Sequence, residues 1–237
     1  MPSVDDGAKS LGESLEILYQ MKSDGITDVI ATPHFYPDSD TLENFKARTQ
    51  ASFNCLTAIV EGKGLPRIML GSEVFYYRGI GSTETVKEFC LNGSSYLLLE
   101  LTDRCINDSL FSDFYRLRYN LGITPIIAHL ERYYKSPNYK KLLAFTQKEH
   151  ILAQVNASSF FIKGLSKTAE KLVKNGYINF IGTDAHSPDK RPPVMREALT
   201  YISEHLGSNY ASGFIRNSRI LLEQIKESQD DQQFITY

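Results

Sequence analysis

Short apolar runs alternate along the chain with longer segments in which apolar residues recur every three or four positions. The short runs predict six strands, at residues 26–32, 68–70, 96–101, 123–128, 151–155 and 178–181. The longer segments predict helices, the main ones at residues 10–25, 42–60, 85–90, 110–121, 139–150, 166–174, 191–206 and 217–226. Strands that alternate with helices favour a parallel sheet with helices outside it, either as an α/β barrel or as an open doubly wound sheet.

The 237 residues suffice for one barrel, although length alone also permits two small domains. No internal repeat or low-complexity linker interrupts the pattern, so we expect a single domain over residues 1–237. The polar residues 227–237 are expected to form a frayed tail. No Gly-x-Gly-x-x-Gly motif follows the early strands, so a dinucleotide fold would lack its phosphate-binding turn.

Charge and cysteine content narrow the class of protein. A net charge of -2 and a pI near 6.2 argue against nucleic acid as a partner, because nucleic-acid binding usually needs a basic face. No apolar run is long enough to predict a membrane span. The widely spaced Cys55, Cys90 and Cys105 indicate reduced thiols in a cytoplasmic protein. None of them is followed six positions later by arginine, which sets aside a covalent cysteine phosphatase.

Acids and histidines follow the predicted strands at the points where these end: His34, Glu73, Glu100, His129, Asp184 and His186. Asp6 lies in the polar turn before the first helix. The carboxyl ends of barrel strands form the edge where active sites assemble, so we expect one shared site. An acid among leucines, such as Glu100, is costly unless it is paired or liganded. For Asp184 and His186, which can converge because they are two positions apart, the alternative is a hydrogen-bonded pair without catalytic function.

Imidazoles and carboxylates without thiolates suit manganese, iron or zinc, including several ions that share a bridging carboxylate. Arg132 and Arg191 lie just beyond two of the strand ends. A guanidinium fork matches phosphate oxygens, so a metal cluster with two arginines points to phosphoester hydrolysis. The alternatives are an ion pair between Arg132 and Glu131 and a solvated charge at a helix start for Arg191.

Six motifs occur in order: Val4-Asp5-Asp6-Gly7-Ala8-Lys9-Ser10, Ala31-Thr32-Pro33-His34, Gly71-Ser72-Glu73, Ala128-His129-Leu130-Glu131-Arg132-Tyr133, Gly182-Thr183-Asp184-Ala185-His186 and Arg191-Pro192-Pro193. The chain thereby resembles the bacterial capsular-type protein tyrosine phosphatases of the polymerase and histidinol phosphatase (PHP) superfamily. The resemblance implies a distorted seven-stranded (β/α) barrel with a trinuclear site that is commonly supported by manganese. It also implies a substrate, the phosphotyrosine tail of the autokinase that controls exopolysaccharide assembly.

By the same resemblance, Asp6, His34 and His186 are expected to bind one metal. Glu100 and His129 would bind a second.

Glu73 would bridge to a third ion, which Asp184 also binds. Arg132 and Arg191 would hold the phosphate, and Asp184 could pass a proton to the leaving phenolate.

The family's first strand ends in His-x-His just before the Val-Asp-Asp-Gly turn, whereas this sequence starts at Met1, within two residues of that turn. We therefore expect the barrel's first strand and two further imidazoles to be missing from the chain, which puts its activity as written in question. Two other functions stay open. One is a PHP-type phosphoesterase that acts on a small phosphate metabolite. The other is an inactive protein that docks onto the kinase tail.

Overall fold

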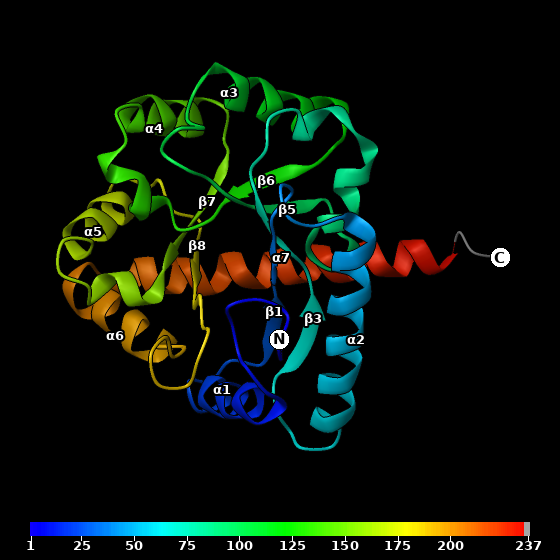
Figure 1. Cartoon of the computed structure of the whole chain (residues 1–237). Coiled ribbons are helices and arrows are strands. Elements are labelled where there is room, and N and C mark those ends of the chain that lie inside the picture. The colour runs from blue at the N-terminus through cyan, green and yellow to red at the C-terminus, as the bar shows by residue number, and fades with distance from the viewer. Residues whose placement is uncertain (235–237) are drawn as a thin grey trace.

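The structure, a computed structural model, describes the backbone of residues 1–234 and the side chains of residues 1–226. Six parallel strands form a curled sheet in the order β2-β4-β5-β6-β7-β8, and β1 and β3 form a second, two-stranded parallel sheet. The strands are β1 (Asp28–Ala31), β2 (His34–Phe35), β3 (Arg67–Leu70), β4 (Glu73–Phe75), β5 (Tyr96–Glu100), β6 (Thr124–Ile127), β7 (Leu152–Asn156) and β8 (Phe180–Gly182). Helices surround the sheet (Figure 1), so the predicted α/β architecture is confirmed as a parallel half-barrel.

The first two predicted strands, at residues 26–32 and 68–70, correspond to β1 and β3, and the short strands β2 and β4 that follow them were not predicted. β1 and β2 are separated by Thr32 and Pro33, and proline has no backbone N–H to donate to a neighbouring strand. β3 and β4 are separated by Gly71 and Ser72. A Cβ atom on Gly71 would lie 2.7 Å from Leu91 Cδ2, so this close approach requires glycine. At each of these two breaks the chain passes from the two-stranded sheet to the six-stranded sheet.

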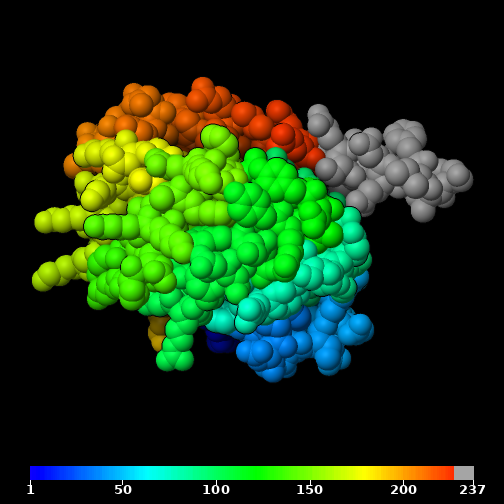
Figure 2. Space-filling view, turned by 90° about the horizontal axis from the view of Figure 1, so that it is seen from above, coloured from blue at the N-terminus to red at the C-terminus, as the bar shows by residue number. Residues whose placement is uncertain are grey.

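The helices are α1 (Leu11–Ser23), α2 (Leu42–Val60), α3 (Asp108–Tyr115), α4 (Tyr139–Lys148), α5 (Ser166–Lys174), α6 (Met195–His205) and α7 (Ser208–Phe234). Ser10 and Thr41 cap α1 and α2 with their side-chain oxygens, as expected for helix starts. Figure 2 shows α7 (orange to red) along one flank of the molecule and α2 (blue) along the opposite flank. In the described part of the chain, no helix is both long and apolar enough to cross a membrane.

The predicted helices at residues 85–90 and 110–121 are confirmed as helical. The first is a 3₁₀-helix over residues 84–89, and the second is α3, which ends at Tyr115 and continues as a π-helical turn. The helix predicted at residues 191–206 is wrong in extent. α6 begins at Met195 rather than Arg191, because Arg191 pairs with Ser187 in an antiparallel bridge and residues before proline favour extended backbone.

The last helix is the largest correction. α7 begins at Ser208, directly after Gly207, and its backbone continues through residues 227–234. The predicted start at residue 217 is therefore wrong, whereas the frayed tail at residues 227–237 stays a prediction. The rest of that tail, residues 235–237, lies outside the described residues.

The main apolar core lies between the sheet and the outer helices. On β5, Leu97 and Leu99 are fully buried in this core, while Leu98 and Glu100 alternate toward the concave face of the sheet. A separate apolar cluster joins α1, α2 and the two-stranded sheet through residues such as Leu18, Leu56 and Ile68.

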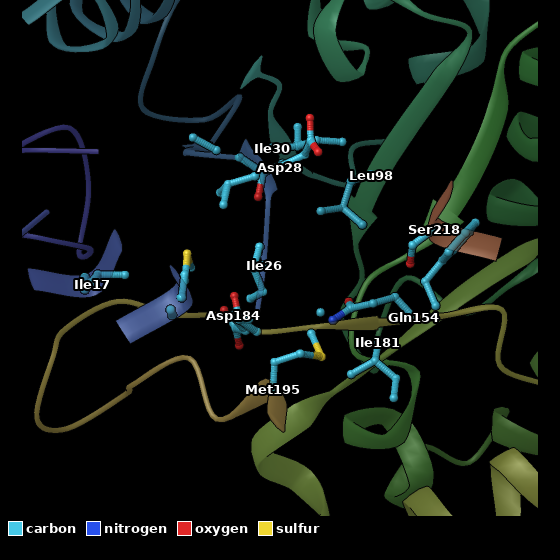
Figure 3. Close-up of a pocket in the computed structure, with 18 of the residues that line it drawn as sticks. Ile17, Ile26, Asp28, Ile30, Leu98, Gln154, Ile181, Asp184, Met195 and Ser218 are labelled. Atoms are coloured by element: carbon cyan, nitrogen blue, oxygen red, sulfur yellow. The ribbon is translucent and has the colours of Figure 1, made fainter. Parts of the chain in front are cut away.

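The half-barrel has an open side. Among the described residues, β1 pairs only with β3, and β8 pairs only with β7. A cavity of about 690 Å³ lies between them, lined by Ile26 and Ile30 on one side, by Ile181 on the other and by Leu98 on the sheet (Figure 3). Candidate site residues lie around this cavity, including Asp184.

Candidate metal and phosphate site

The carboxyl ends of the strands bring the predicted site residues to one edge of the sheet. The parallel register places His34 of β2 opposite Glu73 of β4, and Phe75 of β4 opposite Glu100 of β5. His129 follows β6, and Asp184 with His186 follows β8. The sheet thus assembles side chains that are far apart in the sequence, as expected for an α/β barrel edge.

Asp6, His34 and His186 form the first cluster. Asp6 Oδ1 lies 3.4 Å from His34 Nδ1 and 3.3 Å from His186 Nε2, and the ligand atoms of all three residues lie within 4.8 Å of one another. Both histidines are largely buried, whereas the side chain of Asp6 is 62% exposed. This set of two imidazoles and one carboxylate fits a divalent ion at the mouth of the site.

His34, Glu73 and Glu100 form the second cluster, again with ligand atoms within 4.8 Å of one another. His129 joins it, because its Nε2 lies 3.0 Å from Glu73 Oε1 and 3.5 Å from Glu100 Oε1. Glu73 and His129 are almost inaccessible to solvent. Burial raises the pKa of Glu100, as expected when carboxylates are gathered away from water. A cation would compensate for this concentration of buried acids.

Two residues without an assigned function orient these histidines. Asp5 Oδ2 accepts a hydrogen bond from the backbone N–H of His34 and lies 3.0 Å from its Nδ1. Tyr133 Oη lies 3.1 Å from His129 Nδ1. Such partners fix the ring that presents the other nitrogen to a metal. Two adjacent acids in one turn, Asp5 and Asp6, give no sequence signal for which of them faces the metal.

The charges around His34 change its protonation. Burial favours the neutral ring, but the hydrogen bond to Asp5 and the charges of Glu73, Asp5 and Asp6 outweigh burial and raise the pKa of His34 to about 9. Burial likewise disfavours the carboxylate of Asp5, yet its hydrogen bonds from His34 hold the pKa of Asp5 well below its usual range.

Two arginines converge on Asp184 from different loops. Arg132 Nη2 lies 2.5 Å and Arg191 Nη2 2.7 Å from Asp184 Oδ2. Both arginine side chains remain about 40% exposed and so have donors free to face a ligand from the mouth of the site. Burial opposes ionisation of Asp184, but the two guanidinium charges outweigh it and lower the pKa of this carboxyl.

The described residues show neither an ion pair between Arg132 and Glu131 nor an isolated, solvated charge at Arg191. Glu131 is fully buried and accepts hydrogen bonds from Ser159 Oγ and the Asn156 backbone rather than from Arg132. Arg191 lies against Asp184 and, at 3.7 Å, Asp6 rather than standing alone. Asp184, in turn, belongs to neither candidate metal cluster of the described residues. Its expected bond to a third ion stays a prediction.

His129 and Asp184 both have left-handed backbone conformations, with φ of 35° and 49°. Such conformations cost non-glycine residues on the order of 1–3 kcal/mol and persist where the surrounding structure enforces them. At the strand ends they turn the two side chains back into the site.

A parallel half-barrel that carries imidazoles, carboxylates and two arginines at its carboxyl edge defines a metal-dependent phosphate-binding protein of the α/β-barrel type. Residues 1–223 match the family described as capsular polysaccharide synthesis, CpsB/CapC. The chain belongs to this CpsB/CapC family.

Individual relatives agree with the family match. The chain is 29% identical to the CapC protein of Staphylococcus aureus, with 92% of this chain and 87% of the relative covered. It is 26% identical to the tyrosine-protein phosphatase CpsB of Streptococcus agalactiae serotype III, over 93% and 94% of the two chains.

A solved structure extends the likeness to the fold. It comes from crystal structures of YwqE from Bacillus subtilis and CpsB from Streptococcus pneumoniae, described as unique metal-dependent tyrosine phosphatases. The TM-score is 0.84 at 26% sequence identity, over 94% of this chain and 91% of the other.

Proposed function

We propose that this chain is a metal-dependent protein tyrosine phosphatase. The observation that carries the proposal is the pair Arg132 and Arg191, which converge beside two clusters of metal-capable residues. Family membership and the phosphatase names of the relatives support it. The chain is thus an enzyme of the phosphoric monoester hydrolase class, and Cys90, whose thiol has its pKa raised by burial to about 12, has no part in the reaction.

Each site residue has a proposed function. Asp6, His34 and His186 hold one ion, while Glu73, Glu100 and His129 hold a second. Arg132 and Arg191 each bind two phosphoryl oxygens through the guanidinium fork, and they stabilise the charge that builds up on these oxygens during transfer. When bound, divalent ions would supply Lewis-acid polarisation of the phosphoryl group and an activated water.

Asp184 holds both arginines in place, and its expected contribution to a third ion remains part of the proposal. Its function as proton donor to the leaving phenolate stays a prediction. A carboxyl with a lowered pKa is ionised at neutral pH, so Asp184 would first have to take up a proton from solvent.

The metal and the substrate are proposed more specifically. Manganese suits the nitrogen and oxygen ligands, as iron and zinc also do. The substrate is the phosphotyrosine tail of a capsule or exopolysaccharide autokinase, which is supported by the capsular context of the family.

The fold is proposed as one domain, a distorted (β/α)₇ barrel. Among the described residues, β1 and β8 each have one unpaired side, and this arrangement with the cavity of about 690 Å³ between them supports a seventh strand at this place. By resemblance that strand would end in His-x-His and bring two imidazoles to the ion beside Glu73 and Asp184.

The test is turnover of a phosphotyrosine peptide, compared with histidinol phosphate and a sugar phosphate, with and without added Mn²⁺. The comparison is run for this chain and for the chain extended by a strand that ends in His-x-His. We expect Mn²⁺-dependent turnover of the peptide, higher in the extended chain. Preference for a small phosphate would replace the proposal by the metabolite phosphoesterase. Peptide binding without turnover in both chains would indicate a docking protein.

A further inference from the structure

β7, which lies between β6 and β8, is the strand of the six-stranded sheet whose carboxyl end provides no acid or histidine to the site. The inward-facing residues at that end are two amides, Gln154 and Asn156, which are two positions apart and therefore on one face. Asn156 is 1% and Gln154 9% exposed. Buried amides need hydrogen-bond partners, and these two find them in the candidate site.

The hydrogen bonds run across three strand ends. Gln154 Oε1 accepts from the backbone N–H of His129 at 2.9 Å, and Gln154 Nε2 donates to Asn156 Oδ1 at 2.8 Å. Asn156 Nδ2 then donates to Asp184 Oδ2 at 2.6 Å. The end of β7 is itself held, because the backbone N–H of Asn156 donates to buried Glu131.

This series of hydrogen bonds begins and ends at the strained backbone of the site. His129 and Asp184 are the site residues with left-handed φ, and each forms a hydrogen bond directly with one of the two amide side chains. Gln154 satisfies the N–H that the turn at His129 removes from the strand ladder. Asn156 holds the carboxylate that carries both arginines.

Gly182 makes room for this arrangement. A Cβ atom at position 182 would lie 2.1 Å from Gln154 Nε2, so only glycine allows the Gln154 side chain to lie against β8. The sequence of β8 is thus adapted to the amide of β7.

We propose that Gln154 and Asn156 are positioning residues of the site: Gln154 fixes His129 toward the metal cluster, and Asn156 fixes Asp184, and through it Arg132 and Arg191, toward the phosphoryl group. The inference rests on the proposed function, because it takes His129 as a metal ligand and the arginines as phosphate ligands. It assigns the two halves of the site to two different amides.

The test uses near-isosteric variants that keep volume and remove the hydrogen bonds, Gln154→Met and Asn156→Leu. Asn179→Leu is the matched control, because the Asn179 side chain accepts from the β7 backbone at Ala153, at the opposite end of the strand. Calorimetric titration measures the affinity for Mn²⁺ and, on Mn²⁺-loaded protein, for inorganic phosphate. Unfolding temperatures without metal are measured alongside.

We expect Gln154→Met to weaken Mn²⁺ binding by about 10–100-fold, the usual effect of losing a partner of a metal ligand. Asn156→Leu should weaken phosphate binding by about tenfold. Asn179→Leu should lower the unfolding temperature and leave both affinities within about threefold of wild type.

Wild-type affinities in both β7 variants, or equal losses in the control, would overturn the inference. If one β7 variant does not fold, the other still decides its own half. Wild-type protein that binds Mn²⁺ and phosphate but does not hydrolyse phosphotyrosine would refute the proposed function and leave this inference standing on the affinities.

Discussion

Metal binding to this site should release a proton, and its affinity should rise with pH. An imidazole must be unprotonated to bind a metal. In the metal-free protein the surrounding acids raise the pKa of His34 to about 9 and so keep its ring protonated at neutral pH. The ion therefore competes with a proton. The sign follows directly: a raised pKa lowers the apparent metal affinity at every pH below it, and the loss disappears as the pH approaches that value.

The magnitude comes from the same pKa. Below a pKa of about 9 the unprotonated fraction of His34 falls about tenfold for each pH unit. The Mn²⁺ affinity should therefore rise about 100-fold from about pH 6 to about pH 8, which corresponds to about 2.7 kcal/mol. At neutral pH, binding of the ion at the cluster of Asp6, His34 and His186 should release about one proton from His34.

Calorimetric titration with Mn²⁺ in two buffers of different ionisation enthalpy measures both the affinity and the protons released. Asp5→Asn is the informative variant, because it removes the carboxylate that accepts from His34 Nδ1. The pKa of His34 should fall, and the pH dependence should become shallower. An Mn²⁺ affinity that is constant over this pH range, with no proton release in the wild-type protein, would refute the reasoning.

Three further predictions concern single positions and the metal. Arg132→Lys and Arg191→Lys keep the charge but lose the bidentate fork, so each should cost about 1.5–3 kcal/mol in kcat/KM for a phosphotyrosine peptide; unchanged values would separate these arginines from the phosphoryl group. Gly182→Ala should destabilise the fold by about 1–3 kcal/mol in denaturant unfolding, while Gly213→Ala in α7, with open space around it, should be neutral or stabilising. Chelation by EDTA should abolish turnover and lower the unfolding temperature, and Mn²⁺ should restore both.

The order of most strands and helices could be predicted, because the apolar runs are clear in the sequence. The breaks at Pro33 and at Gly71 could also be predicted, because proline and glycine end an apolar run. The short strands β2 and β4 could not, because two or three residues are too few to show a periodicity. The start of α7 was also missed. Gly213 and several polar residues suggest a loop, but packing of α7 against α6 and β8 overrides this local preference.

The candidate site residues could be predicted because acids and histidines at strand ends are conspicuous, and the structure brings them together. Which of them binds which ion stays a prediction. Gln154 and Asn156 were missed because an amide neither titrates nor commonly ligates these metals, and polar residues are common at strand ends. Spacing of two in a strand, adjacent to a ligand-bearing strand on each side, was the signal that could have revealed them.

The molecule has a boundary where the chain passes from the two-stranded sheet to the six-stranded sheet. On one side lie α1, α2, β1 and β3 with an apolar cluster of their own, seen together at the bottom of Figure 1, and on the other lies the six-stranded sheet. Asp6 precedes α1, whereas His34 and His186 extend from the larger sheet's edge strands. An ion bound by these three residues would link the two parts across this boundary. Its removal should speed hydrogen exchange at the backbone amides of β1 and β3 before those of β5 to β7, so that activity and the association of the two parts depend on the same ion.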